Sequence, residues 1–222
     1  YEPGKPILRG LNLRMDLDDR IGLLGVNGAG KSTFAKMIAK ALPIEAGEFH
    51  RDGKMRVGWF HQHQIEAMDP TDTPLEIIRR AMPEASESSR RSKLAQFGLP
   101  FEKQETKVEA LSGGERARLL LNLVAMDAPH ILILDEPTNH LDDVALDFLT
   151  RRLVEHPGGV AVVSHDRALL RAVCTDIVDL DPSQDGRPRR YSGGYAGWAK
   201  GRRRARAAWE QEYAEQNAER ER

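Results

Sequence analysis

The stretch Gly25-Val26-Asn27-Gly28-Ala29-Gly30-Lys31-Ser32 matches the pattern G-x-x-x-x-G-K-[ST] in full. It follows an apolar run, Ile21–Leu24, that predicts a buried strand, and it precedes a predicted helix over about 31–42. Glycines let the backbone turn so that successive N–H groups point at one anion, and the following helix adds the positive end of its dipole. In this pattern Lys31 reaches the β- and γ-phosphates of a nucleotide and the Ser32 hydroxyl binds Mg²⁺. The stretch therefore predicts a phosphate-binding loop within a βαβ unit.

Two carboxylates follow a second apolar strand, Ile131–Leu134. Asp135 and Glu136 then lie at the carboxyl end of that strand, which is where ligands bind to open parallel sheets. Asp135 is placed to hold Mg²⁺, directly or through water, and Glu136 to orient or deprotonate an attacking water. Such a pair taken alone could equally be surface acids after a core strand. Beside a complete phosphate loop, it favours a catalytic interpretation.

A third motif is Leu111-Ser112-Gly113-Gly114-Glu115. Ser112 and Glu115 have the spacing of a capping box, so they predict the start of a helix. Two glycines in the first turn leave the backbone N–H groups unshielded by side chains, which makes a second possible anion site. The alternative is a well-capped helix that binds no ligand. The motif alone does not decide between an anion site and such a helix.

Elsewhere the chain alternates predicted strands with predicted helices. Leu11, Leu13, Met15 and Leu17 alternate with polar residues, which is the pattern of a half-buried strand. Further strands are predicted at 57–60, 160–163 and 177–180, and helices at about 114–126, 144–153 and 167–173. The segment from about 70 to 110 holds four prolines and predicts short helices separated by loops. The alternation predicts a mostly parallel sheet with helices on both faces.

The composition limits the classes of protein to consider. The chain has 222 residues, enough for one large domain, and 40% of them are hydrophobic. Its longest apolar segments, Leu119–Met126 and Ile131–Leu134, are far shorter than the roughly 20 residues of a membrane span. We therefore expect no membrane insertion and a cytoplasmic location. Cys174 is the only cysteine, which excludes an intrachain disulfide and argues against a thiolate metal site.

The formal net charge of -1 is unevenly distributed. Residues 187–222 carry ten basic and five acidic residues, so the rest of the chain is net acidic. A basic tail on an acidic body suggests a polyanionic partner, with a solvated helix end as the alternative.

Four motifs occur in the order and spacing of ATP-binding cassette (ABC) ATPases: the phosphate loop, LSGGE at 111–115, ILILDEP at 131–137 and SHD at 164–166. On these residues the chain resembles ABC ATPases over nearly its whole length. The stretch Asp135–Asp142, DEPTNHLD, most resembles the ABC-F group of soluble translation factors, and the chain resembles the second cassette of such proteins. Transporter cassettes more often carry Ser-Ala in place of Asn139-His140.

The resemblance implies an α/β fold. Its parts are a P-loop NTPase core with a mostly parallel sheet, a small antiparallel β part and a helical subdomain at about 70–126. The ATP-binding cassette domain is expected over 1–190, and residues 191–222 are expected to form a basic C-terminal helical extension. The expected ligands are ATP and Mg²⁺.

The resemblance also implies roles for individual residues. Tyr1, which stands 24 residues before Gly25, is expected to stack on adenine. Gln62 is expected to touch Mg²⁺ and the attacking water, with Gln64 as the alternative. His165 is expected to contact the γ-phosphate, although a histidine between a strand and a helix can be purely structural. The predicted catalytic residues are Glu136, His165 and Gln62, and the predicted metal ligands are Ser32, Gln62 and Asp135. The predicted ATP-binding residues are Tyr1, Gly25, Asn27, Gly28, Ala29, Gly30, Lys31, Ser32, Thr33, Ser112, Gly113 and Gly114.

The active unit of the family is a sandwich of two cassettes, in which the LSGGE motif of one closes on the ATP held by the other. Because the chain has one copy of each motif, we expect it to need a second cassette. That cassette would be a second copy or, if the chain is a fragment of a tandem protein, part of the same polypeptide. Leu141-Asp142 resembles the loop that links the two cassettes.

The predicted function is therefore an ATPase that acts as an ATP-gated clamp in a ribosome-associated factor. Cationic residues of the tail are hypothesised to contact ribosomal RNA phosphates: Lys200, Arg202, Arg203, Arg204 and Arg206. The alternative is the ATP-binding subunit of an ABC transporter, docking on separate membrane proteins through the 70–110 segment. A DNA-repair ATPase is less favoured, because the sequence has neither a long coiled-coil insertion nor zinc-binding cysteines.

Overall fold

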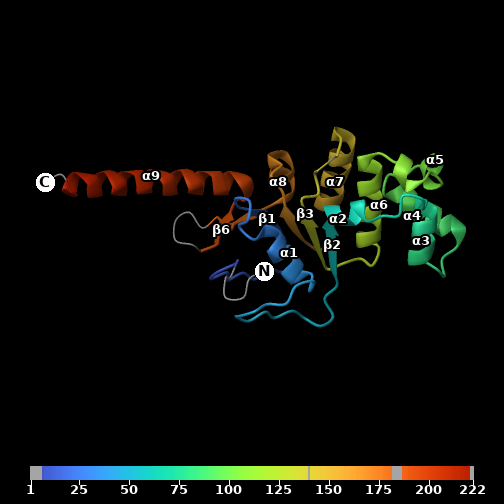
Figure 1. Cartoon of the computed structure of the whole chain (residues 1–222), viewed down its shortest axis with the longest axis horizontal. Coiled ribbons are helices and arrows are strands. Elements are labelled where there is room, and N and C mark those ends of the chain that lie inside the picture. The colour runs from blue at the N-terminus through green and yellow to red at the C-terminus, as the bar shows by residue number, and fades with distance from the viewer. Residues whose placement is uncertain (1–6, 140, 182–186, 221–222) are drawn as a thin grey trace.

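The chain folds around one central sheet. A computed structural model describes residues 7–139, 141–181 and 187–220. Within them the strand order is β2-β3-β4-β1-β5-β6, with β1 to β5 parallel and β6 antiparallel to β5 (Figure 1). The strands are β1 (Arg20–Leu24), β2 (Val57–His61), β3 (Ile131–Asp135), β4 (Gly159–Val163), β5 (Asp176–Asp179) and β6 (Arg189–Ser192). The predicted mostly parallel α/β architecture is confirmed.

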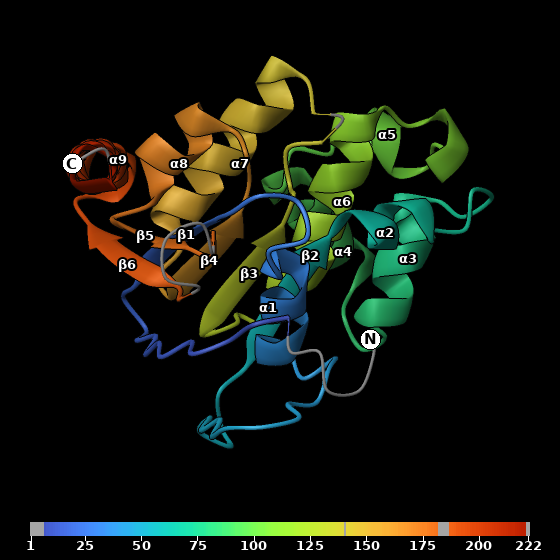
Figure 2. The same ribbon diagram turned by 60° about the vertical axis from the view of Figure 1, so that its left-hand side comes forward.

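Helices cover both faces of this sheet (Figure 2). Along β3, Leu132 and Leu134 join a hydrophobic cluster shared with α6, α7 and α8, whereas Ile131 and Ile133 join a second cluster shared with α1. Successive side chains of a strand point to opposite faces, so an all-apolar strand such as β3 serves both cores. The helices of this core are α1 (Lys31–Ile38), α2 (Gln62–Glu66), α6 (Gly113–Ala125), α7 (Asp143–Glu155) and α8 (Arg167–Val173).

Side-chain caps fix where these helices begin. Ser112 accepts a hydrogen bond from the Glu115 backbone N–H, and Glu115 accepts one from the Ser112 N–H, which confirms the predicted capping box. Asp142 caps α7 and Asp166 caps α8 in the same way, each accepting from the backbone N–H three residues on. These caps supply acceptors for backbone N–H groups that have no partner inside the helix.

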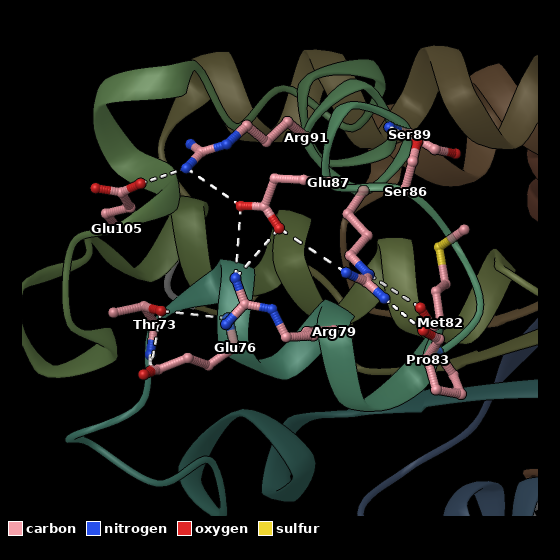
Figure 3. Close-up of polar contacts among 11 residues, drawn as sticks. Thr73, Glu76, Arg79, Met82, Pro83, Ser86, Glu87, Ser89, Arg91 and Glu105 are labelled. Atoms are coloured by element: carbon pink, nitrogen blue, oxygen red, sulfur yellow. Dashed lines mark hydrogen bonds and ion pairs between the residues drawn. The ribbon is translucent and has the colours of Figure 1, made fainter.

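Residues 70–111 form the predicted short helices. They are α3 (Pro74–Ala81), α4 (Glu87–Gln96), α5 (Phe101–Gln104) and the 3₁₀ turn Val108–Ala110. Together with α6 they enclose a third hydrophobic cluster, made of Leu75, Ile78, Leu94, Leu99, Val108, Leu111 and Leu119. At the surface of this region, Glu87 pairs with Arg79, Arg90 and Arg91 (Figure 3). A separate core and a separate ion-pair network are consistent with the predicted helical subdomain. Its predicted boundaries, about 70–126, stay a prediction.

Two predicted elements are wrong in whole or in part. The segment 11–17 does not form the predicted strand, although Leu11, Leu13 and Met15 are half-buried and pack on the cluster around α1. Alternating apolar and polar residues show only that one side of the segment is buried, whereas a strand also needs a neighbouring strand for its backbone hydrogen bonds. The predicted helix at 31–42 ends at Ile38, because Lys40 adopts a φ of 59° and the Ala41 N–H bonds back to the Lys36 carbonyl.

The sequence patterns also missed two short elements, α2 and β6. Within the described residues, the antiparallel part of the sheet is the β5–β6 pair. The tail forms one helix, α9 (Gly194–Arg220), which leaves the body beside β6 and α8 (Figure 1). Among the described residues, no helix has the length and apolar character of a membrane span.

Candidate nucleotide-binding site

The loop between β1 and α1 surrounds the Lys31 ammonium group. Lys31 is 8% exposed, and its Nζ donates to the carbonyls of Gly25 at 2.9 Å and Val26 at 3.3 Å. Gly30 has a φ of 94°, and a Cβ there would lie 2.7 Å from the Leu8 side chain, so the close approach of the N-terminal segment requires glycine. At Gly28 a Cβ would meet no atom within 4 Å, so the outer side of the loop is open.

Ser32 and Asp135 bring the first and second motifs together. The Ser32 hydroxyl donates to Asp135 Oδ1 at 3.1 Å, which joins the first turn of α1 to the end of β3. The described residues contain no group of three or more His, Cys, Asp or Glu side chains arranged to enclose a metal. Mg²⁺ at phosphate sites usually takes one or two protein oxygens and completes its shell with water and phosphate. A hydroxyl beside a carboxylate therefore fits Mg²⁺.

Glu136 occupies a strained backbone position next to Asp135. Its φ is 51°, which is uncommon for a residue with a side chain, and its N–H donates to the Val163 carbonyl of β4 at 2.8 Å. Its carboxylate lies 3.6 Å from Nε2 of His165. Burial raises the pKa of Glu136, His165 and Lys31 oppose that rise, and Asp135 adds to it. Strain and a raised pKa at one carboxyl group are typical of a functional residue.

Gln62 and Gln64, the two alternatives for the third ligand, have different contacts. Gln64 Oε1 accepts from the His61 backbone N–H at 3.0 Å, so it caps α2. Gln62 instead accepts from Asn139 Nδ2 at 2.9 Å and donates to Glu66 at 3.2 Å. Asn139 belongs to the stretch that follows Glu136, so these contacts favour Gln62 over Gln64 as the residue linked to the catalytic end of β3.

The LSGGE motif begins α6, which packs against α7 and β2. A Cβ on Gly114 would lie 2.8 Å from the Ala145 Cβ, so the second glycine lets α6 approach α7. Burial acts to raise the pKa of Glu115, but hydrogen bonds from Ser112 and Lys103 hold that pKa below its ordinary value. Nothing in these contacts joins Ser112, Gly113 or Gly114 to the phosphate loop of the same chain, so the predicted second anion site would lie apart from that loop.

The remaining predicted residues divide into two groups. Asn27 is exposed on the loop, and Ala29 and Thr33 are partly buried on either side of Lys31. Tyr1, together with His140 of the DEPTNHLD stretch, lies outside the described residues.

Sequence reasoning missed a hydroxyl pair formed by residues close in sequence to Glu136 and His165. Thr138 Oγ1 and Ser164 Oγ are 3.2 Å apart, and Ser164 accepts from the Asp166 N–H. The pair links the segments that follow β3 and β4, and its only sequence signal was the position of both residues just beyond a buried strand.

Known proteins are similar to this chain in sequence and in fold. The sequence profile of the ABC transporter family matches residues 8–139, more than half of the chain. The chain belongs to the ABC transporter family. It is 42% identical over 171 residues to the probable ATP-binding protein YheS of Escherichia coli K12, covering 77% of this chain and 27% of YheS.

A second relative matches in sequence, and a solved structure matches in fold. ABC transporter F family member 4 of Arabidopsis thaliana is 38% identical over 180 residues, covering 78% of this chain and 25% of that protein. A dimeric bacterial ABC transporter cassette superposes with a TM-score of 0.70 at 23% identity, covering 86% of this chain and 94% of the other. This cassette therefore spans about a quarter of the length of the curated relatives it matches.

The family match and the complete phosphate loop make this chain an ATP-binding cassette, and the relatives that it matches include members of the ABC-F group.

Proposed function

We propose that this cassette forms half of an ATP-gated clamp in an ABC-F type, ribosome-associated factor. One observation carries the ATPase part of the proposal. Three segments that are distant in sequence meet at the carboxyl ends of β1, β3 and β4. They contribute Lys31 and Ser32, Asp135 and Glu136, and His165. That edge of the sheet is the one where open α/β folds bind ligands.

ATP binding is assigned to the phosphate loop. Backbone N–H groups of residues 25–33 would surround the β- and γ-phosphates, and the Lys31 ammonium would exchange its carbonyl partners for phosphate oxygens. Ser32, Asp135 and Gln62 would hold Mg²⁺, which when bound neutralises charge on the phosphate oxygens. Tyr1 would stack on the adenine ring.

Hydrolysis is assigned to Glu136 and His165. Glu136 would orient the attacking water and accept its proton at the carboxylate, and the left-handed backbone there fixes the direction of that side chain. His165, within 3.6 Å of this carboxylate, would contact the γ-phosphate. Both groups act through position and charge, which is how most phosphoryl-transfer sites lower the barrier.

A second cassette completes the site. Ser112, Gly113 and Gly114 begin α6, away from the loop that holds Lys31, so they would contact the nucleotide of a partner cassette. The similar solved cassette is described as dimeric, which supports the same arrangement here.

The clamp is tested by sedimentation of Glu136→Gln with and without MgATP. Removing the base should block hydrolysis and leave ATP binding intact, so an ATP-dependent dimer should accumulate. Glu155→Gln, an exposed change at the end of α7, is the matched control and should still hydrolyse ATP. A Glu136→Gln chain that binds ATP and stays monomeric would count against closure between two copies.

The ribosomal part of the proposal is supported by the ABC-F relatives and by the basic half of α9. Arg202 is ion-paired to Asp181, so its reversal would also disturb the body. Arg203 and Arg204 are exposed, and the double change Arg203→Glu/Arg204→Glu tests RNA contact more cleanly. Less of the variant than of the wild-type chain should cosediment with ribosomes, and its remaining ribosome binding should depend less steeply on salt concentration. Unchanged cosedimentation would exclude this contact, and copurification with membranes instead would favour the transporter alternative.

A further inference from the structure

Glu136 and His165 approach each other without a hydrogen bond between them. Glu136 Oε1 lies 3.6 Å from His165 Nε2. A hydrogen bond between a ring N–H and an oxygen is roughly 2.7–3.2 Å long. The His165 side chain is 59% exposed, so close packing does not hold it in place. The separation of the two side chains therefore depends on how the segments after β3 and β4 are held to each other.

Two hydrogen bonds join these segments. The Glu136 N–H donates to the Val163 carbonyl at 2.8 Å, which joins the two backbones. Beyond that bond, Thr138 Oγ1 lies 3.2 Å from Ser164 Oγ. Thr138 follows Glu136 by two residues, and Ser164 directly precedes His165. The bond between the two hydroxyls is therefore close in sequence to both functional side chains.

Burial determines the direction of the hydroxyl bond. Ser164 is 1% exposed, and its Oγ accepts from the Asp166 N–H at 3.1 Å. Its own O–H needs an acceptor away from water, and Thr138 Oγ1 is within reach, so Ser164 donates and Thr138 accepts. Asp166 in turn caps α8 by accepting from the Leu169 N–H at 2.9 Å. Both sequence neighbours of His165 are thus attached, one to the segment after β3 and one to α8.

We propose that the bond between Thr138 and Ser164 is a positioning contact that sets the distance from Glu136 to His165. The proposal rests on the roles proposed above for these two side chains. The hydroxyl pair acts through Glu136 and His165 rather than on the nucleotide, because it holds the two segments at the spacing that hydrolysis requires. Since neither Thr138 nor Ser164 belongs to the phosphate loop, loss of the bond should slow hydrolysis and leave ATP binding nearly unchanged.

Steady-state kinetics of Thr138→Val test the contact, because valine keeps the branched shape and removes only the hydroxyl oxygen. The kcat for ATP should fall about tenfold, and KM should change by less than about twofold, because positioning affects the transition state more than the bound substrate. Thr138→Ser keeps the hydroxyl and should recover most of the lost kcat.

Thr150→Val is the matched control. It removes a hydroxyl that donates to the Leu146 carbonyl within α7, so it should hydrolyse ATP like the wild-type chain. A wild-type kcat in Thr138→Val would overturn the proposal. Equal losses in Thr138→Val and Thr138→Ser would overturn it as well, because the hydroxyl would then not be the group that acts.

A double-mutant cycle with His165→Asn separates positioning from a general loss of stability. If Thr138 acts by placing His165 against Glu136, adding Thr138→Val to His165→Asn should lower kcat little further. Losses that multiply would contradict the proposal. A wild-type rate in His165→Asn would refute the proposed role of His165 and this contact with it. Impaired His165→Asn beside unimpaired Thr138→Val would refute the contact alone.

NMR of the histidine rings gives a second measurement that needs no hydrolysis. The chain has seven histidines, and the His165 signal is the one lost in His165→Asn. Without nucleotide, Thr138→Val should shift this signal, whereas Thr138→Ser and Thr150→Val should leave it in place. The signals of His50 and His130 should not move in any of the three variants. An unmoved His165 signal in Thr138→Val, or a shift of all histidine signals, would refute a contact specific to His165.

Discussion

At the scale of single residues, two positions with a predicted function also carry a steric or electrostatic cost. Glu136 has a left-handed backbone and a pKa raised by burial, and both follow from its place between β3 and β4. Gly114 lies where a Cβ would be 2.8 Å from Ala145. Neither cost is visible in the motif, because each arises from a neighbour that is distant in sequence.

Gly114→Ala should destabilise the fold. Alanine is the better helix former by up to about 1 kcal/mol, but overpacking a tight contact costs about 1–3 kcal/mol, so the packing effect should dominate. Urea unfolding should show a net loss of about 1 kcal/mol or more. Adding Ala145→Gly removes the opposing methyl group and should restore part of the loss. Purely additive effects of the two changes would contradict this explanation.

The acid side of the ATPase pH profile should report Glu136. Its carboxyl must be ionised to act as a base, and burial raises its pKa, so the rate should fall at a higher pH than an ordinary carboxyl would give. His165 opposes the rise, so in His165→Asn the pKa of Glu136 increases further. The acid limb of the residual activity should then move to higher pH. If the acid limb of the pH profile did not move, a group other than Glu136 would control it.

At the scale of elements, α9 is held to the sheet by a buried carboxylate. Asp179 is 5% exposed and accepts from the indole N–H of Trp198. Trp198→Phe keeps most of the ring but leaves this acceptor with fewer donors, which should cost about 1–3 kcal/mol in the free energy of unfolding. Trp209→Phe, on the projecting half of the same helix, is the matched control and should change little. Equal effects of the two changes would show that the Asp179 contact contributes nothing specific.

At the scale of the whole molecule, the proposed clamp gives each chain half of each composite site. If closure needs two copies, the ATPase rate per chain should increase with chain concentration, because the fraction in the sandwich increases. Adding Ser112→Arg chains, whose altered LSGGE motif would face the partner's nucleotide, should lower the rate of wild-type chains. A specific activity that is constant over the measured range would mean that one cassette suffices.

The sequence by itself determined the phosphate loop, the acidic pair after β3, the capped start of α6 and the alternation of strands and helices. These features are local, because each depends on residues adjacent in the chain and on backbone preferences that hold in any context. The tertiary structure decided what depends on distant neighbours. Leu11, Leu13 and Met15 alternate like a strand but lack a pairing partner, and Gln62 rather than Gln64 reaches the stretch after Glu136. Only the folded chain shows that α9 leaves the body with two aromatic rings exposed, because burial is a property of what surrounds a side chain.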